Sequence, residues 1–129
     1  MCVKGELVAV AHHGMGKISL LESTDGGVSF SDPIGIGNGF FAHLSCTKEA
    51  VAVAWESTPG NHKSDGKETG WVVYDWTGTQ IDGGSLDDGS SAAGTVHLYS
   101  GAAFVELLWV KVAAEPLVGT LRHQILGLE

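Results

Sequence analysis

The sequence has few cysteines and few basic residues, and it lacks long hydrophobic runs. Its two cysteines, Cys2 and Cys46, make no disulfide framework and lack metal-ligand spacing. Seven Lys and Arg residues against fifteen Asp and Glu residues give a net charge of −8, which argues against binding to a phosphate backbone. The apolar runs are far shorter than the ~18 residues that span a membrane, and the first ten residues do not form a secretory signal. We therefore expect no nucleic-acid partner, no membrane span and, by default, a cytoplasmic protein.

Glycine is abundant, at 19 of 129 residues, and it separates short runs of β-branched, aromatic and aliphatic residues. Such runs, bounded by Gly, Asp and Ser, are typical of strands. The length favours a single all-β domain over residues 1–129. The composition of the last predicted strand would also tolerate a helix. The predicted strands are Glu6–His12, Lys17–Ser23, Val28–Ser31, Phe40–Cys46, Ala50–Glu56, Gly70–Trp76, Thr79–Asp82, Thr95–Ser100, Ala103–Val112 and Leu117–Leu126.

The chain contains weak internal repeats. Leu7–His12 aligns with Ala50–Trp55, Ala42–Leu44 aligns with Val96–Leu98 at a shift that also pairs Trp55 with Trp109, and Glu22–Gly27 aligns with Val73–Gly78. A period of about 43–54 residues with about four short strands is typical of β-propeller blades. The sequence therefore predicts a partial β-propeller with repeats at about 1–37, 38–93 and 94–129, in which the first strand of the first blade would fall before Met1. The alternative is a small antiparallel β-sandwich or barrel.

One motif is specific enough to name a family. The segment Ser23-Thr24-Asp25-Gly26-Gly27-Val28-Ser29-Phe30 resembles the Asp-box, or BNR repeat, of sialidase-like propellers. Ser23, Asp25 and Gly27 match it outright, while Ser29 and Phe30 replace the usual Thr and Trp. The aspartate is expected to accept backbone hydrogen bonds within its own turn, the glycine to adopt a positive φ, and Phe30 to cover the turn. The second copy keeps Gly78 but has Trp76 in place of the aspartate.

The resemblance implies that these turns are structural and that ligands bind at the opposite end of the blades. That end would carry His12–Lys17, Gly35–Gly39, Glu56–Thr69, Asp87–Gly94 and Ala113–Pro116. Sialidases hold a substrate carboxylate with three arginines, whereas this chain has one, Arg122. Two and a half blades cannot close a ring, so we expect self-association, most simply as a homodimer that forms a six-bladed propeller.

The candidate site residues are histidines, tryptophans and carboxylates. His43 and His97 share a repeat position near the expected axis, where they would be weak metal candidates or packed core histidines. Glu56 and Glu106 are weak catalytic candidates, since a glycosidase needs two carboxylates in one cleft; Glu106 could equally face solvent or pair with a lysine. The expected ligand-binding residues are His12, His13, Trp55, Glu56 and Trp109, although both tryptophans could instead pack between blades.

These features predict a non-enzymatic binding module for a glycan or another small polar ligand, without a cofactor. The first alternative is a glycoside hydrolase assembled across subunits. The second is a structural or interaction protein derived from a larger propeller.

Overall fold

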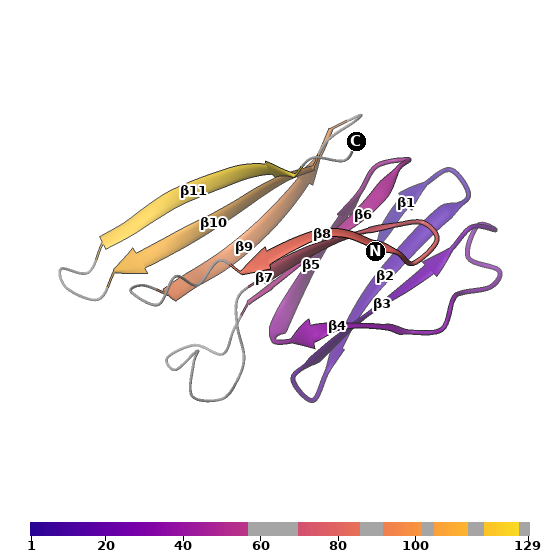
Figure 1. Ribbon diagram of the computed structural model, residues 1–129, viewed down its shortest axis with the longest axis horizontal. Helices are drawn as coiled ribbons and strands as arrows, with labels where there is room; N and C mark the ends of the chain where they lie inside the picture. The colour runs from indigo at the N-terminus through magenta and orange to yellow at the C-terminus, as the bar shows by residue number, and fades with distance from the viewer. Residues whose placement is uncertain (57–69, 86–91, 102–104, 114–117, 127–129) are drawn as a thin grey trace.

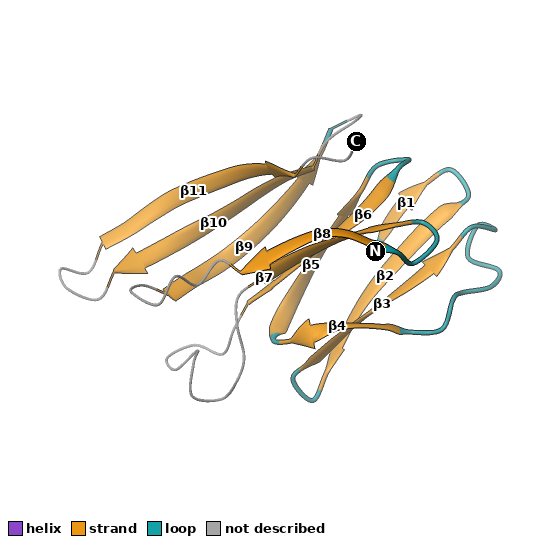
Figure 2. Cartoon of the chain, viewed as in Figure 1, coloured by secondary structure: helices purple, strands orange, loops and turns teal. Residues whose placement is uncertain are grey.

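The computed structural model describes residues 1–56, 70–85, 92–101, 105–113 and 118–126. Within these residues the chain forms three antiparallel sheets, and inside each sheet every strand pairs with its neighbour in sequence (Figures 1 and 2). The described part contains no helix that could cross a membrane. The strands are β1 (Cys2–Lys4), β2 (Leu7–Gly14), β3 (Lys17–Ser23), β4 (Ile34–Asn38), β5 (Phe40–Cys46), β6 (Ala50–Glu56), β7 (Gly70–Asp75), β8 (Gln80–Ser85), β9 (Ala92–Ser100), β10 (Val105–Ala113) and β11 (Val118–Leu126).

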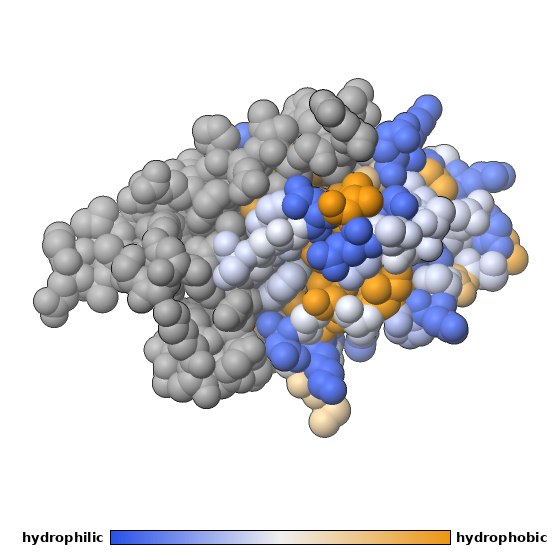
Figure 3. Space-filling model, viewed as in Figure 1, coloured by the Kyte–Doolittle hydropathy of each residue, from blue (hydrophilic) through white to orange (hydrophobic). Residues whose placement is uncertain are grey.

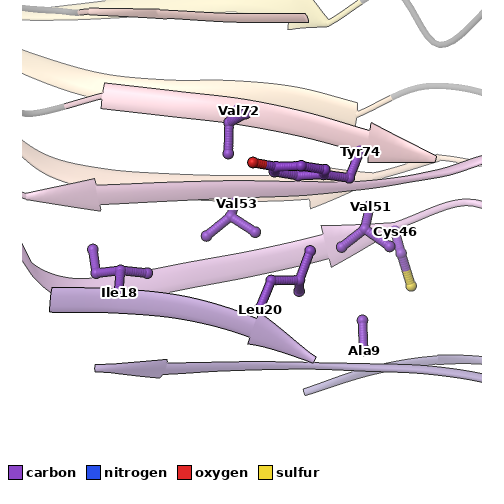
Figure 4. Close-up of a cluster of buried hydrophobic side chains, with 8 residues drawn as sticks. All are labelled: Ala9, Ile18, Leu20, Cys46, Val51, Val53, Val72 and Tyr74. Atoms are coloured by element: carbon purple, nitrogen blue, oxygen red, sulfur yellow. The ribbon is translucent and has the colours of Figure 1, made fainter. Parts of the chain in front are cut away.

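The sheets are stacked along the longest axis of the molecule, with β5–β8 between β1–β4 and β9–β11 (Figure 1). One core lies between the first and second sheets (Figure 4) and consists of Ala9, Ile18, Leu20, Cys46, Val51, Val53, Val72 and Tyr74. The other lies between the second and third sheets and consists of Ala50, Ala52, Ala54, Trp71, Val73, Val105 and Leu107. The all-β prediction is confirmed, and the described sheets form an open stack that does not close into a barrel.

Strand β6 explains why the middle sheet can be covered on both faces. Its residues Ala50–Ala54 are all almost fully buried. Successive side chains of a strand point to opposite faces, so its valines pack on the first sheet and its alanines pack on the third. A strand covered on both faces is expected to be a continuous apolar run, and this one is.

The N-terminus corrects two predictions. Cys2–Lys4 forms β1, which pairs with Leu7–Ala9, so the first strand of the first sheet lies within the chain and not before Met1. The two cysteines, which were expected to make no disulfide framework, form a Cys2–Cys46 disulfide. This bond joins the first strands of neighbouring sheets, β1 and β5. Cysteine spacing alone could not reveal this pair because it depends on sheet packing.

The fourth strand also lies elsewhere than predicted. Val28–Ser31 is a loop, and the strand that pairs with β3 is Ile34–Asn38. This stretch was expected to be a glycine-rich loop. The glycines are needed because the indole of Trp55 lies over them: a Cβ at Gly37 would come within 3.2 Å of the ring, and one at Gly39 within 2.4 Å.

The aligned repeats correspond to strands of the same rank. Leu7–His12 and Ala50–Trp55 lie in the second strands of their sheets, while His43 and His97 lie in first strands. Residues 118–126, whose composition would tolerate a helix, form the last strand, β11. The sheets contain four, four and three strands in chain order, where the sequence predicted three, four and three.

Candidate functional site

Strand pairing separates the described turns into two ends of the stack. The β2–β3 turn and the β4–β5 connection lie at one end, where Gly14 pairs with Lys17 and the Gly39 N–H donates to the Gly16 carbonyl. The turn after β3 lies at the other end, where the Gly26 N–H donates to the Glu6 carbonyl. The expected ligand-side stretches His12–Lys17 and Gly35–Gly39 are thus opposite the Ser23–Phe30 turn. Residues 57–69, 87–91 and 114–116 of that expected face lie outside the described residues.

A pocket of about 500 Å³ lies at the first of these ends, where β5 runs beside β9. We call it the imidazole pocket; it is lined by His13, Phe41, Ala42, His43, Glu56 and His97. The His43 and His97 rings lie 5.0 Å apart between centroids. His43 Nε2 lies 3.9 Å from Glu56 Oε1. Four of the residues expected to act at a site, His13, His43, Glu56 and His97, therefore meet here.

The electrostatics of the imidazole pocket favour a neutral His43. Burial lowers the pKa of this imidazole, and the neighbouring His97 lowers it further, while Glu56 raises it. Burial disfavours the charged form of a histidine, so the lowered pKa favours the neutral form of His43. A neutral imidazole has one nitrogen that donates and one that accepts a hydrogen bond. No cluster of three or more His, Cys, Asp or Glu residues that could hold a metal occurs among the described residues.

Phe41 is the unusual residue of the imidazole pocket. Its φ is +51° and its side chain is 58% exposed. The residue lies at an irregularity in the pairing of β5 with β6, between Phe40 and His43. A bulky residue at positive φ is strained by roughly 1–3 kcal/mol, and strained residues cluster at functional sites. The Phe41 ring lies 6.4 Å from the His13 ring between centroids, so both rings border the same space.

Trp55 does not line the imidazole pocket. It is half-buried against the core between the first and second sheets, and its indole is in close contact with Gly37, Gly39 and Gly70. A Cβ at Gly70 would lie 2.7 Å from the ring. Of the two roles considered for Trp55, stacking on a ligand and packing between sheets, this contact corresponds to packing.

Three other predicted site residues lie apart from the imidazole pocket or are only partly described. His12 is exposed and adjacent to His13 in β2, so its side chain points to the other face of the sheet. Trp109 pairs with Arg122 across β10 and β11, and its side chain is outside the described residues. Glu106 is half-buried opposite Tyr99 and does not line the pocket. Among described residues, the imidazole pocket therefore contains the single carboxylate Glu56.

The Ser23–Phe30 turn has the internal hydrogen bonds expected from its sequence. Asp25 accepts bonds from the Ser29 N–H at 2.9 Å and the Ser29 hydroxyl at 2.5 Å, while the Ser23 hydroxyl donates to Asp25 at 2.7 Å. These bonds lower the pKa of Asp25 to about 2. Gly27 has a φ of +87°, and the Phe30 ring lies 3.8 Å from where its Cβ would be. The roles predicted for Asp25 and Gly27 and the position predicted for Phe30 are confirmed.

The second sheet contains a similar turn one position away from the predicted alignment. Asp75, and not the residue at position 76, accepts bonds from the Thr77 N–H at 2.9 Å and the Thr79 N–H at 3.0 Å. Hydrogen bonds from Thr77 and Thr79 lower its pKa, and Gly78 has a φ of +82°. The aspartate and the residue four positions later are bonded in both turns, and each turn follows the third strand of its sheet. The predicted alignment paired Asp25 with position 76; moving it by one residue pairs Asp25 with Asp75, although Gly78 then aligns with Val28 and not with Gly27.

Comparisons with protein families, with curated proteins and with solved structures find no match to this chain. The case for its function therefore depends on its own geometry. The imidazole pocket offers an exposed aromatic ring, three imidazoles and, among the described residues, one carboxylate. These groups can bind a polar ligand that also has an apolar face.

Sequence reasoning missed Phe41 as a site residue. The adjacent pair Phe40-Phe41 was the available signal, because two neighbouring residues of a regular strand cannot both face one core.

Proposed function

We propose that the chain is a non-enzymatic binding module that takes a glycan or a similar polyol in the imidazole pocket. The observation that carries the proposal is the exposed Phe41 ring, held at positive φ beside His13, His43 and Glu56. Aromatic rings stack on the C–H face of a sugar, and the His43 imidazole and the Glu56 carboxylate can bind its hydroxyls. A volume of about 500 Å³ suits a mono- or disaccharide.

The propeller interpretation supports this location. Each sheet is a meander of consecutive strands, and β5 packs beside both β1 and β9, so the first strands lie together. The Asp25 and Asp75 turns occupy equivalent positions at the opposite end. In sialidase-like propellers, Asp-box turns lie at that end and ligands bind at the other. On this interpretation the imidazole pocket lies beside the axis of the ring.

We further propose that a second copy of the chain completes the ring. The outer face of the first sheet carries the cross-strand pairs Val3 with Val8 and Val10 with Leu21. Val3 is 53% exposed, and Val10 and Leu21 are partly exposed. On the face where β8 lies in front, the apolar residues form small patches among polar side chains (Figure 3). Two copies with three sheets each would supply six blades.

Sedimentation velocity tests the dimer. We expect a dimer at micromolar concentration and a shift towards monomer in a Val10→Glu variant, because a charge would then lie in the interface. A wild-type chain that sediments as a folded monomer would remove the closed ring from the account.

A saccharide titration tests the binding function. Calorimetry and NMR against a panel of neutral and acidic mono- and disaccharides should find a binder, and Phe41→Ala should weaken its affinity at least tenfold. Tyr99→Ala is the matched control, since Tyr99 is an aromatic residue of similar exposure on β9 that does not line the imidazole pocket. The absence of any binder, or equal losses in the two variants, would contradict the proposal.

The disulfide supports a further proposal, that the chain folds in an oxidising compartment. Disulfides form and persist in secreted and periplasmic environments and are rare in the cytosol, and Cys2–Cys46 joins two sheets. This proposal replaces the cytoplasmic expectation. Thiol titration of the protein from its natural source should find both cysteines oxidised.

A further inference from the structure

A second cavity lies at the end of the stack opposite the imidazole pocket. It has a volume of about 480 Å³ and lies between the Asp25 turn of the first sheet and the Asp75 turn of the second. We call it the Glu22 cavity. Its lining residues are Glu22, Ser23, Thr24, Ser29, Phe30, Ser31, Asp32, Ile34, Trp76, Thr77 and Gly78.

Glu22 is a buried carboxylate in this cavity. It lies near the end of β3, pairs with Ala9 and shares the sheet face of Leu20, so it points towards the second sheet. Only 5% of the residue is exposed, and its Oε1 has no hydrogen-bond partner. Buried polar atoms are nearly always hydrogen-bonded. An unpartnered carboxylate oxygen that lines a cavity is therefore a group that a ligand could satisfy.

The charges around Glu22 are all negative. Asp75, at the end of β7, repels the Glu22 carboxylate, and Asp32 lines the same cavity. Tyr74 of β7 also lies near Glu22, but burial and then Glu22 raise the pKa of its phenol, so it adds no charge. The lining contains no Lys, Arg or His among the described residues. The Asp75 carboxylate is already engaged by Thr77 and Thr79. A ligand with a positive charge would remove the repulsion between Glu22 and Asp75 and give Oε1 a donor.

The walls of the Glu22 cavity are fixed by hydrogen bonds. The Ser31 N–H donates to the Glu22 carbonyl at 2.8 Å, and the Ser31 hydroxyl accepts from the Glu22 N–H at 3.1 Å. The Trp76 indole donates to the Thr47 carbonyl at 3.2 Å. Phe30, at 43% exposure, supplies a second aromatic wall. A preformed site loses less free energy on ordering when a ligand binds.

We propose that the Glu22 cavity binds the ammonium group of a small organic amine. A carboxylate together with aromatic walls suits an organic cation, whose charge is attracted by ring faces. The Ser and Thr hydroxyls of the lining can accept its remaining N–H bonds. A bare metal ion fits less well, because the described acidic residues do not form a metal-binding cluster and the cavity is much larger than an ion. This site is separate from the imidazole pocket, so either can fail without the other.

The binding is expected to depend on pH. Burial, followed by the negative charge of Asp75, raises the pKa of Glu22 to about 7, while a backbone N–H of Gly78 opposes the shift. An ammonium needs the ionised carboxylate, so affinity should rise up to tenfold per pH unit below pH 7 and become constant above it. Bound amine should in turn lower the pKa of Glu22.

The test is an NMR titration with n-butylammonium chloride at pH 8, followed at the Trp76 indole N–H, with n-butanol and sodium chloride as probes without an ammonium group. We expect saturable shifts with the amine alone. The Glu22→Gln variant should lose at least tenfold in affinity. Glu49→Gln is the matched control, because it removes one exposed charge at the same end of the stack without touching the cavity, and it should change affinity less than twofold.

Three outcomes would overturn the proposal. They are the absence of saturable shifts in the wild type, equal responses to n-butanol and the amine, and equal losses in the Glu22 and Glu49 variants. Well-dispersed spectra of both variants establish that each is folded before the affinities are compared.

Discussion

The buried carboxylate of Glu22 gives the sharpest stability prediction. Its pKa lies at about 7 in the folded chain against 4.5 for an ordinary glutamate. Because the folded state holds its proton to higher pH, stability should fall as pH rises from about 4.5 to about 7 and then stay level. One pKa unit corresponds to about 1.4 kcal/mol, so the full shift amounts to about 3 kcal/mol. Water at the mouth of the cavity screens part of this, and we expect about 2 kcal/mol.

The assay is urea unfolding of the wild type and Glu22→Gln at pH 5 and pH 8, at one protein concentration and without amine. The glutamine keeps the shape and removes the charge, so the variant should gain about 2 kcal/mol relative to the wild type between the two pH values. Other titrating groups, such as His43, cancel in this difference. The free energy of unfolding of Glu49→Gln should change with pH as that of the wild type does. A difference between Glu22→Gln and the wild type that does not change with pH would refute the reasoning.

Four further predictions concern the disulfide, the strained phenylalanine, a glycine and the first Asp turn. Reduction, or Cys2→Ser with Cys46→Ser, should lower the free energy of unfolding by about 4 kcal/mol for a separation of 44 residues, and an unchanged urea midpoint would contradict this. Phe41→Gly should be about 1 kcal/mol more stable than Phe41→Ala in urea unfolding, since only glycine adopts a positive φ without strain. Equal stabilities of the two variants would mean that the backbone is not strained at this position. Gly39→Ala should destabilise the chain by about 1–3 kcal/mol through its clash with Trp55, and the double variant Gly39→Ala/Trp55→Leu should recover part of the lost stability. Thermal melts in which Gly39→Ala is as stable as the wild type would contradict the contact. Asp25→Asn should lower the stability of the chain at neutral pH and make it depend less on pH between about 4 and 2. The lowered pKa of Asp25 stabilises the fold above about pH 4, and this effect is lost as pH falls towards about 2. Thermal melts at acid pH in which the variant matches the wild type would disprove it.

The sequence predicted the strands best where apolar runs were long. Ala50–Glu56 and Lys17–Ser23 were placed with their observed bounds, because the first is mainly a continuous apolar run and the second has buried apolar residues at alternate positions. The fourth strand was missed because its glycines look like a loop until Trp55 is seen to occupy the space above them. The short strand Cys2–Lys4 carries too little apolar character to stand out, and its disulfide depends on the stacking of two sheets.

The candidate sites were also only partly predictable, because some of their features depend on how strands pair and sheets pack. The repeat alignment brought His43 and His97 together, because equivalent positions of adjacent first strands must be neighbours. Phe41 escaped notice, since its position follows from a pairing irregularity in β5 that leaves no periodic signal. Glu22 looked like an ordinary residue at the end of a strand. Its isolation becomes visible only when the second sheet covers it.

Imidazole NMR during a saccharide titration tests the central claim most directly, because the adjacent residues His12 and His13 lie on opposite faces of one strand. The account predicts that the ring signals of His13, His43 and His97 shift together and saturate at one ligand concentration, while those of His12 stay in place. Shifts confined to His12, or a titration in which the three pocket imidazoles do not respond while ligand binds, would contradict it.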